Sequence, residues 1–193
     1  MTKYNIPTFA RNAIYYIYTK FFFKNHARIV KCFPRLITIG HINFGTDITL
    51  GVDARIEALS TAAKIKFGNC VKINDYCHIG ALSEISIGDN VLIGSRVTIV
   101  DHDHGVYSGL EFHSLPTTAP DSRELPASPI YIGDNTWIAE GVTILSGVRV
   151  GPGCVIGANS VVASDIPDNS IAAGVPAKVI KKFNKATNSW EKQ

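Results

Sequence analysis

Aliphatic residues recur every six positions through the C-terminal part of the chain. The series reads Ile132, Ile138, Ile144, Val150, Ile156 and Val162. A small or β-branched residue follows four positions after most of them, as Thr136, Val142, Val148, Cys154 and Ser160. Neither the two-residue period of a strand nor the helical period of about 3.6 residues produces this spacing. A chain that forms one flat face of a triangular prism per six residues does produce it, with the aliphatic residues pointing inward.

The same period occurs earlier in the chain. It is read at Ile73 and Ile79, at Ile87, Ile93 and Ile99, and more weakly from Ile37 through Ile48 and Ile56. Residues that tolerate positive φ follow at the expected corners, as in Gly88-Asp89-Asn90, Gly133-Asp134-Asn135 and Gly151-Pro152-Gly153. We therefore expect an all-β solenoid of about five or six coils, each built from three hexapeptides around one continuous apolar core.

Three segments depart from this period. Residues 101–129 are polar, contain three of the six histidines, and are expected to form a loop that protrudes from the solenoid. We assign residues 1–35 to an N-terminal arm that is helical, residues 36–180 to the solenoid with its loop, and residues 181–193 to a C-terminal tail. The tail is basic and then polar, and is expected to form a short helix with a loose end.

Composition is that of a single soluble domain, with 193 residues, 46% of them hydrophobic, and a net charge of +3. The four cysteines, Cys32, Cys70, Cys77 and Cys154, form no C-x-x-C pair. We expect them to be small buried apolar residues in a reducing, cytoplasmic compartment rather than a disulfide or metal framework.

The net charge hides a basic arm. No acidic residue occurs before Asp47, whereas seven basic residues do: Lys3, Arg11, Lys20, Lys24, Arg28, Lys31 and Arg35. The arm's aromatic run, residues 14–23, is shorter than the about 20 apolar residues that span a bilayer. Two interpretations stay open: a helix on an anionic membrane surface at the inner face of the cytoplasmic membrane, or a helix packed on the main domain or a neighbouring subunit. No nucleic-acid partner is expected.

Several motifs resemble those of the hexapeptide-repeat acetyltransferases, in the branch of galactoside, maltose and polysaccharide O-acetyltransferases. They are IGDNVLIG at residues 87–94, DHDHG at 101–105, IGDNTWIA at 132–139 and DIPDNSIAAGVPAKVI at 165–180. The resemblance implies a left-handed parallel β-helix, acetyl-CoA as the co-substrate with no metal, and a homotrimer whose sites lie between subunits. It also implies transfer of acetyl to a carbohydrate hydroxyl.

Acetyl transfer to a hydroxyl needs a base, and histidine suits this task because its pKa lies near the working pH. Two histidines compete. Counted without gaps from Ile87, His104 takes the position of the family's catalytic histidine, whereas His102 follows the strand more closely; we rank His104 first. The other histidine, with Asp101 and Asp103, is expected to orient the base or to hold the acceptor. His113, in the middle of the loop, matches no family position, and the pattern of His26, His41 and His78 does not favour a metal site.

The resemblance also implies binding residues. Asn74 matches the asparagine that binds the acceptor, although Gly80-Ala81-Leu82 replaces residues that are often acidic, and Asn74 can equally be a turn residue. The positions that match the coenzyme A site are Trp137, Ala139, Gly157, Ala158, Ala163, Ser164, Lys178 and Lys181. Trp137 can equally be an outward aromatic that packs on the loop.

The sequence therefore predicts an acetyl-CoA-dependent O-acetyltransferase that acts on a bacterial surface polysaccharide, either O antigen or capsule, or on its lipid-linked precursor. Two alternatives stay open. One is an acetyltransferase for a small acceptor, such as a free sugar, a nucleotide-linked amino sugar or an antibiotic. The other is a non-catalytic β-helical scaffold, which predicts no transfer and no effect of substitutions at His102 and His104.

Overall fold

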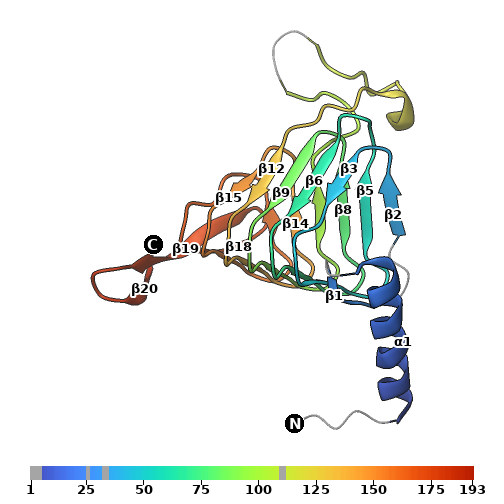
Figure 1. Ribbon diagram of the computed structural model, residues 1–193. Coiled ribbons are helices and arrows are strands. Elements are labelled where there is room, and N and C mark those ends of the chain that lie inside the picture. Colours follow the sequence, from blue (N-terminus) through green and yellow to red (C-terminus); the bar gives the residue numbers. More distant parts are fainter. Residues whose placement is uncertain (1–5, 25–26, 32–34, 109–111) are drawn as a thin grey trace.

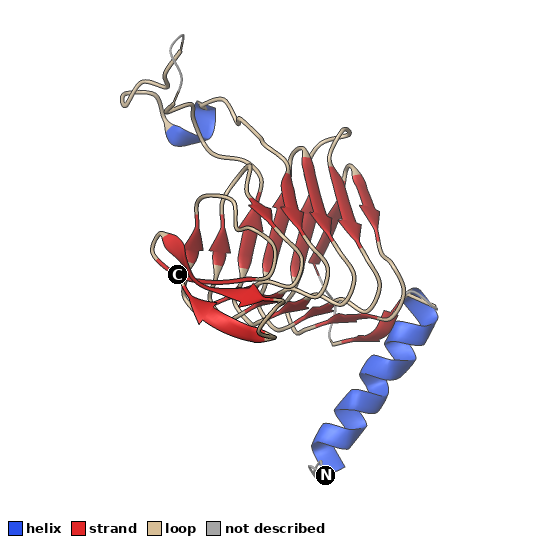
Figure 2. Cartoon of the chain, turned by 90° about the vertical axis from the view of Figure 1, so that its left-hand side faces the viewer, coloured by secondary structure: helices blue, strands red, loops and turns tan. Residues whose placement is uncertain are grey.

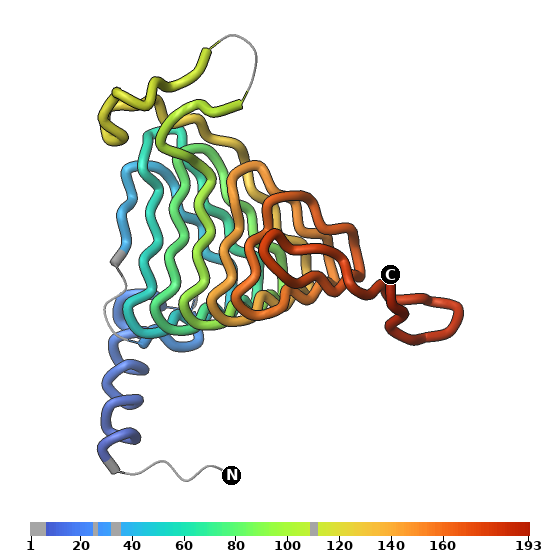
Figure 3. Tube along the Cα trace, turned by 180° about the vertical axis from the view of Figure 1, so that it is seen from behind, coloured from blue at the N-terminus to red at the C-terminus, as the bar shows by residue number. Residues whose placement is uncertain are grey.

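The computed structural model describes residues 6–24, 27–31, 35–108 and 112–193. Its main body is a solenoid of short parallel strands, drawn as stacked coils in Figures 1 and 3. The predicted left-handed parallel β-helix is confirmed. Lys3, His26 and Cys32 lie outside the described residues.

Three sheets form the faces of the prism. The first sheet contains β1 (Ala27–Val30), β4 (Ile48–Leu50), β7 (Lys72–Ile73), β10 (Leu92–Ile93), β13 (Trp137–Ile138), β16 (Val155–Ile156), β18 (Ser170–Gly174), β19 (Ala177–Asn184) and β20 (Ser189–Lys192). The second contains β2 (Arg35–Thr38), β5 (Arg55–Ala58), β8 (His78–Ala81), β11 (Thr98–Val100), β14 (Thr143–Ile144) and β17 (Val161–Val162). The third contains β3 (His41–Asn43), β6 (Lys64–Phe67), β9 (Glu84–Ile87), β12 (Ile130–Ile132) and β15 (Arg149–Val150).

The solenoid has about seven turns, more than the five or six expected from the period. The additional turn lies at the N-terminal end, where the hexapeptide pattern is weak. There Leu36, not Ile37, pairs with Ile56, and Ile37 is 39% exposed. The expectation that Ile37 points inward is therefore wrong, because the strand register places Leu36 over the core instead.

The period of six positions the core as predicted. The inward series from Ile132 to Val162 is at most 1% exposed, and Thr136, Val148 and Ser160 of the accompanying series are buried as well. Each coil places these side chains directly over those of the coil below, as in the pairs Ile93–Ile138 and Ile138–Ile156. Continuous stacking of this kind buries apolar surface along the whole solenoid.

The cysteines fit this core only in part. Cys77 and Cys154 are buried, and burial raises the pKa of the Cys77 thiol to about 11. Cys70 is exposed, so the expectation of burial is wrong for this residue. Its backbone has a φ of 58° at a corner of the solenoid, which turns its side chain away from the core.

Helix α1 (Ile6–Phe22) leaves the first coil and extends beyond it, as Figures 1 and 2 show. Its C-terminal end is anchored by Thr19, whose hydroxyl is fully buried, donates to the carbonyl of Tyr15 at 2.6 Å and accepts from the Val30 N–H at 2.7 Å. Phe23 then packs edge-on against Phe44. No helix in the described part of the chain is long and apolar enough to cross a membrane.

The C-terminal tail is not a helix. Strand β19 pairs antiparallel with β18, and β20 pairs antiparallel with β19, so the chain ends in a hairpin beside the last coil. The predicted short helix is therefore wrong: these residues pair with a strand edge that the local sequence does not reveal. The 3-10 helix η1 (Pro120–Ser122) lies in the protruding loop between β11 and β12.

Candidate active site

The protruding loop begins where strand alternation carries Asp101 and His102 to opposite faces. Ile99 points into the core, and Val100 points outward on the second sheet. Continuing this alternation, Asp101 is fully buried while His102 is partly exposed on the outer face. The sequence therefore places a carboxylate inside the corner of the prism and an imidazole directly beside it.

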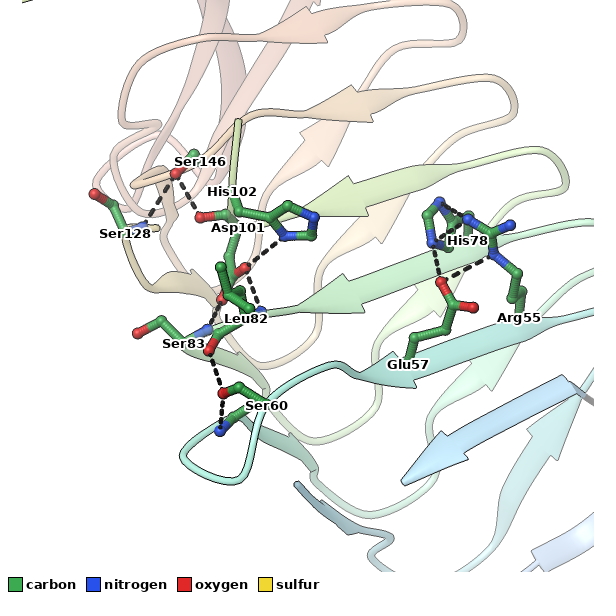
Figure 4. A network of polar contacts seen from close by, with 11 residues as sticks. Arg55, Glu57, Ser60, His78, Leu82, Ser83, Asp101, His102, Ser128 and Ser146 are labelled. Carbon is green, nitrogen blue, oxygen red and sulfur yellow. Dashed lines mark hydrogen bonds and ion pairs between the residues drawn. The ribbon is translucent and has the colours of Figure 1, made fainter. Parts of the chain in front are cut away.

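Asp101 connects three levels of this corner, as Figure 4 shows. Its side-chain oxygens accept hydrogen bonds from the backbone N–H groups of Leu82 (2.7 Å) and Ser83 (2.8 Å), one coil earlier. Its backbone carbonyl accepts from the Ser128 N–H (2.8 Å) and from the Ser146 hydroxyl (2.6 Å), which belong to the loop's end and to the next coil. These contacts hold both ends of the loop to the solenoid.

The same carboxylate positions His102. His102 Nδ1 lies 3.1 Å from Asp101 Oδ1, and the side chain of His102 is 11% exposed. When Nδ1–H donates to a carboxylate, the neutral imidazole presents Nε2 as its free acceptor. The carboxylate of Asp101 therefore fixes the orientation of the His102 ring.

His104 stands further out. Its side chain is exposed, and its ring centroid lies 6.5 Å from that of His102. The backbone carbonyl of His104 accepts a hydrogen bond from the Tyr107 hydroxyl (2.6 Å), which itself accepts from Arg123 (2.6 Å). The loop is thus braced at the backbone of His104, while its imidazole faces solvent. Asp103 is exposed too and takes part in the loop through its backbone N–H.

A second polar cluster lies on the outer face of the second sheet, near His102. His78 Nε2 is 2.9 Å from Glu57 Oε2, and Arg55 Nη2 is 2.8 Å from His78 Nε2 (Figure 4). Burial lowers the pKa of His78 below 6.5, a shift that the hydrogen bond to the Glu57 carboxylate partly offsets. Sequence reasoning missed Arg55 and Glu57; the alignment of β5 with β8 is the signal that places them beside His78.

Asn74 does not meet the histidines within one chain. It is an exposed residue at the corner where the chain passes from the first sheet to the second. Asp101 and His102 follow β11, at the corner where the chain passes from the second sheet to the third. The length of the second sheet's strands therefore separates the two positions. The described residues also contain no group of three His, Cys, Asp or Glu side chains that could hold a metal ion.

The residues matched to the coenzyme A site lie on the last coils. Trp137 is 49% exposed on β13, and Ala139 follows it with 9% exposure. Gly157 and Ala158 follow β16, directly above, whereas Ala163 and Ser164 follow β17 at the next corner. A Cβ atom on Gly157 would lie 2.9 Å from the Cβ of Ala173, so close packing alone already requires glycine there.

The two lysines of this set lie on β19. Its pairing places Lys178 opposite Ala173 and Lys181 opposite Ile171. The hairpin thereby brings positive charge beside the last strand of the solenoid. Apart from Trp137, the set thus consists of small side chains at or near the corners and cations at their edge, and these cations suit a phosphate-bearing molecule.

Comparison with known proteins gives this arrangement a family. Two protein-family models match the chain. They are described as "Bacterial transferase hexapeptide (six repeats)", which matches residues 129–164, and "Hexapeptide repeat of succinyl-transferase", which matches residues 84–106. The chain is 42% identical over 191 residues to the "Putative lipopolysaccharide biosynthesis O-acetyl transferase WbbJ" of Escherichia coli K12, covering 98% of this chain and 96% of that protein. It is 43% identical over 139 residues to the galactoside O-acetyltransferase of Escherichia coli K12, covering 70% and 64%.

Solved structures agree. The hexapeptide-repeat acetyltransferase VCA0836 of Vibrio cholerae, complexed with acetyl coenzyme A, superposes with a TM-score of 0.62 at 28% identity, covering 74% of this chain and 72% of that one. A galactoside acetyltransferase in complex with coenzyme A superposes with a TM-score of 0.56 at 29% identity, covering 82% and 72%. With these matches along nearly its whole length, the chain belongs to the hexapeptide-repeat acetyltransferase family.

Proposed function

We propose that this protein transfers acetyl from acetyl-CoA to a hydroxyl group of a bacterial surface polysaccharide or of its lipid-linked precursor. The observation that carries the proposal is the imidazole of His102, held by a fully buried carboxylate at the root of the loop. The similarity to WbbJ, whose name refers to lipopolysaccharide biosynthesis, supports a polysaccharide acceptor.

We assign the base to His102 and not to His104, which reverses the order expected from spacing. Nε2 of His102 accepts the proton of the acceptor hydroxyl as the hydroxyl oxygen attacks the thioester carbonyl of acetyl-CoA. The carbon–sulfur bond then breaks, and the imidazolium returns the proton to the departing thiolate. Asp101 stabilises the imidazolium between these steps because its carboxylate lies 3.1 Å away.

Acetyl-CoA is the donor substrate that the C-terminal coils suit. Ala158, Ala163 and Ser164 are small and exposed, so the pantetheine arm can approach the backbone closely. Lys178 and Lys181 supply the cations for its phosphates. Asn74 and Asp103 are kept as acceptor-binding residues, because both are exposed and both carry side chains that hydrogen-bond sugar hydroxyls.

The active assembly in this proposal is a homotrimer, since one chain holds Asn74 and the histidine loop at the two opposite corners that flank the second sheet. The enzyme works in the cytoplasm, at the inner face of the cytoplasmic membrane if the acceptor is lipid-linked. The alternative acceptors, a free sugar or another small molecule, receive support from the similarity to galactoside O-acetyltransferase.

The test is thiol release from acetyl-CoA with three acceptors: a polysaccharide repeat unit, its lipid-linked form and a simple galactoside. We expect the first two to be preferred. His102→Ala is expected to lower the rate by about 100-fold or more, as removal of a general base does, and His104→Ala by less. His113→Ala in the same loop is the matched control, expected to stay within about twofold.

The outcomes separate the alternatives. Preference for the galactoside would contradict the polysaccharide acceptor and favour the alternative of a small acceptor. Loss of activity with His104→Ala but not His102→Ala would return the base to His104. Absence of any acetyl transfer in the unsubstituted protein would favour the non-catalytic scaffold.

A further inference from the structure

A cationic cleft lies between α1 and the outer face of the first sheet. Its volume is about 450 Å³, and its walls include Arg28, Lys31 and Lys72 together with Tyr16 of α1. None of the described residues that line it is acidic. Within the described part of the chain, none of these three cations forms an ion pair, since the four ion pairs found involve other residues. The cleft therefore presents positive charge that its own walls do not neutralise.

The surroundings of the cleft reinforce this charge. No acidic residue precedes Asp47 in the sequence, and Arg11, Lys20 and Lys24 belong to α1 or follow it directly. Lys20 Nζ lies 5.5 Å from the ring centroid of Tyr16, at the edge of the cleft. The local field consequently favours an anion over a neutral or cationic ligand.

Helix α1 also carries an exposed apolar surface, on its side away from the solenoid. Ile14, Ile17 and Phe21 are 64%, 67% and 76% exposed, and their i, i+3, i+7 spacing places them on one face of the helix. Phe9 and Tyr16, seven residues apart, lie about 100° further round the helix, on the side of the cleft, and are 68% and 53% exposed. Because Thr19 and Phe23 anchor only the end of the helix to the first coil, more than half of each of these side chains is left uncovered by the described part of the chain.

We propose that this cleft binds the phosphate group of an anionic membrane lipid while α1 lies along the bilayer interface. A membrane surface offers phosphates to the cleft at the level of its headgroups and apolar chains to the outward face of α1, whereas free phosphate satisfies only the cleft. A second copy of the chain is a poorer occupant, because its own arm carries the same positive charge. The inference rests on the proposed function in one respect: a lipid-linked acceptor gives the enzyme a reason to be at the membrane.

Vesicle flotation tests this proposal with the full-length protein. The vesicles are phosphatidylcholine alone, and phosphatidylcholine with about one third phosphatidylglycerol. We expect binding to the anionic vesicles only, weakened by added salt. Each basic residue near an anionic surface contributes about fivefold to binding, so Arg28→Ala with Lys31→Ala is expected to weaken binding about 25-fold. Lys72 is left intact because it lies two residues from Asn74.

A matched control removes the same charge elsewhere. Lys185→Ala with Lys192→Ala changes the C-terminal hairpin and is expected to weaken vesicle binding by less than about twofold. An equal loss in both double variants would show that net charge alone matters, and would overturn the cleft. Ile17→Ser with Phe21→Ser is expected to abolish vesicle binding; if it changes the oligomeric mass and leaves vesicle binding intact, the apolar face is a subunit contact and the proposal fails.

Two further measurements separate the possible failures. Inorganic phosphate alone is expected to compete poorly with anionic vesicles, and efficient competition would make the cleft a site for soluble phosphate. Acetyl transfer to a soluble acceptor is expected to be unchanged in the Arg28/Lys31 variant. Lost membrane binding with intact transfer concerns only this inference, whereas absent transfer in the unsubstituted protein concerns only the proposed function.

Discussion

At the scale of single residues, the buried carboxylate of Asp101 determines how the loop begins. It accepts two backbone N–H groups through different oxygens, so Asp101→Asn would turn an NH₂ group toward one of those donors. We expect a loss of about 1–3 kcal/mol in the free energy of unfolding, the usual cost of a buried polar group left without a partner. Acetyl transfer should fall as well, since His102 loses its charged partner. Denaturant titration and initial rates measure the two effects.

The neighbouring carboxylate gives the matched control for this residue. Asp103 is exposed, and no side-chain hydrogen bond of it to the described residues is found, so Asp103→Asn should change the free energy of unfolding by less than about 0.5 kcal/mol. Equal destabilisation by both substitutions would contradict the bracing role of Asp101. A fall in transfer with Asp103→Asn at unchanged stability would support its place in acceptor binding.

His78 makes stability depend on pH. Burial lowers its pKa in the folded chain below 6.5, the ordinary value that applies to the unfolded chain. At a pH between the folded and the unfolded pKa, the unfolded chain therefore binds more protons than the folded one. This contribution to stability is present above pH 6.5 and is lost as pH falls toward the lower, folded pKa. We expect His78→Gln, which cannot titrate, to lose less stability between about pH 7 and about pH 5.5. Identical pH slopes in the two proteins would contradict this prediction.

The residue scale also shows what the sequence could and could not predict about the site. The histidine loop and its two carboxylates are recognisable in DHDHG, because they interrupt the period. Their ranking is not, since the partners of Asp101 are backbone groups of Leu82 and Ser83, in the preceding coil. Gap-free counting compares positions along the chain, whereas the contact that distinguishes His102 from His104 depends on how two coils stack.

At the scale of the strand, the opposite orientations of the two side chains of β10 can be tested directly. In β10, Ile93 is fully buried and Leu92 is 38% exposed. Ile93→Ala should lower the free energy of unfolding by about 2–5 kcal/mol because it leaves a cavity between stacked coils. Leu92→Ala in the same strand should cost less than about 1 kcal/mol, as it removes only surface contacts. Similar costs at both positions would contradict the inward phase of the repeat.

Elements were predictable where one hexapeptide repeats the next, and not where pairing partners are distant. The strands after residue 132 follow from the six-residue period because each copy supports the phase of its neighbours. Near Ile37 few copies exist to fix the phase, and the strand is offset by one residue. The C-terminal hairpin has no period at all, since β19 is specified by the free edge of β18.

At the scale of the whole molecule, the proposal that Asn74 and the histidine loop serve one site requires more than one chain. The two positions lie at opposite corners of the second sheet, and a rigid solenoid cannot bring them together. In the proposed homotrimer, a closed ring of identical subunits, the loop of one subunit would meet the opposite corner of the next. Light scattering should then give three times the chain mass of 20.9 kDa.

Mixing two inactive variants tests whether the site is shared. His102→Ala and Asn74→Ala are each expected to be inactive alone. When they are co-expressed and assemble at random, a site is complete only where a subunit with intact His102 precedes one with intact Asn74, so about a quarter of the unsubstituted activity should return. Mixing the proteins after assembly should restore nothing, which controls for contamination. If co-expression also restores nothing while each variant still forms trimers, His102 and Asn74 do not serve one shared site.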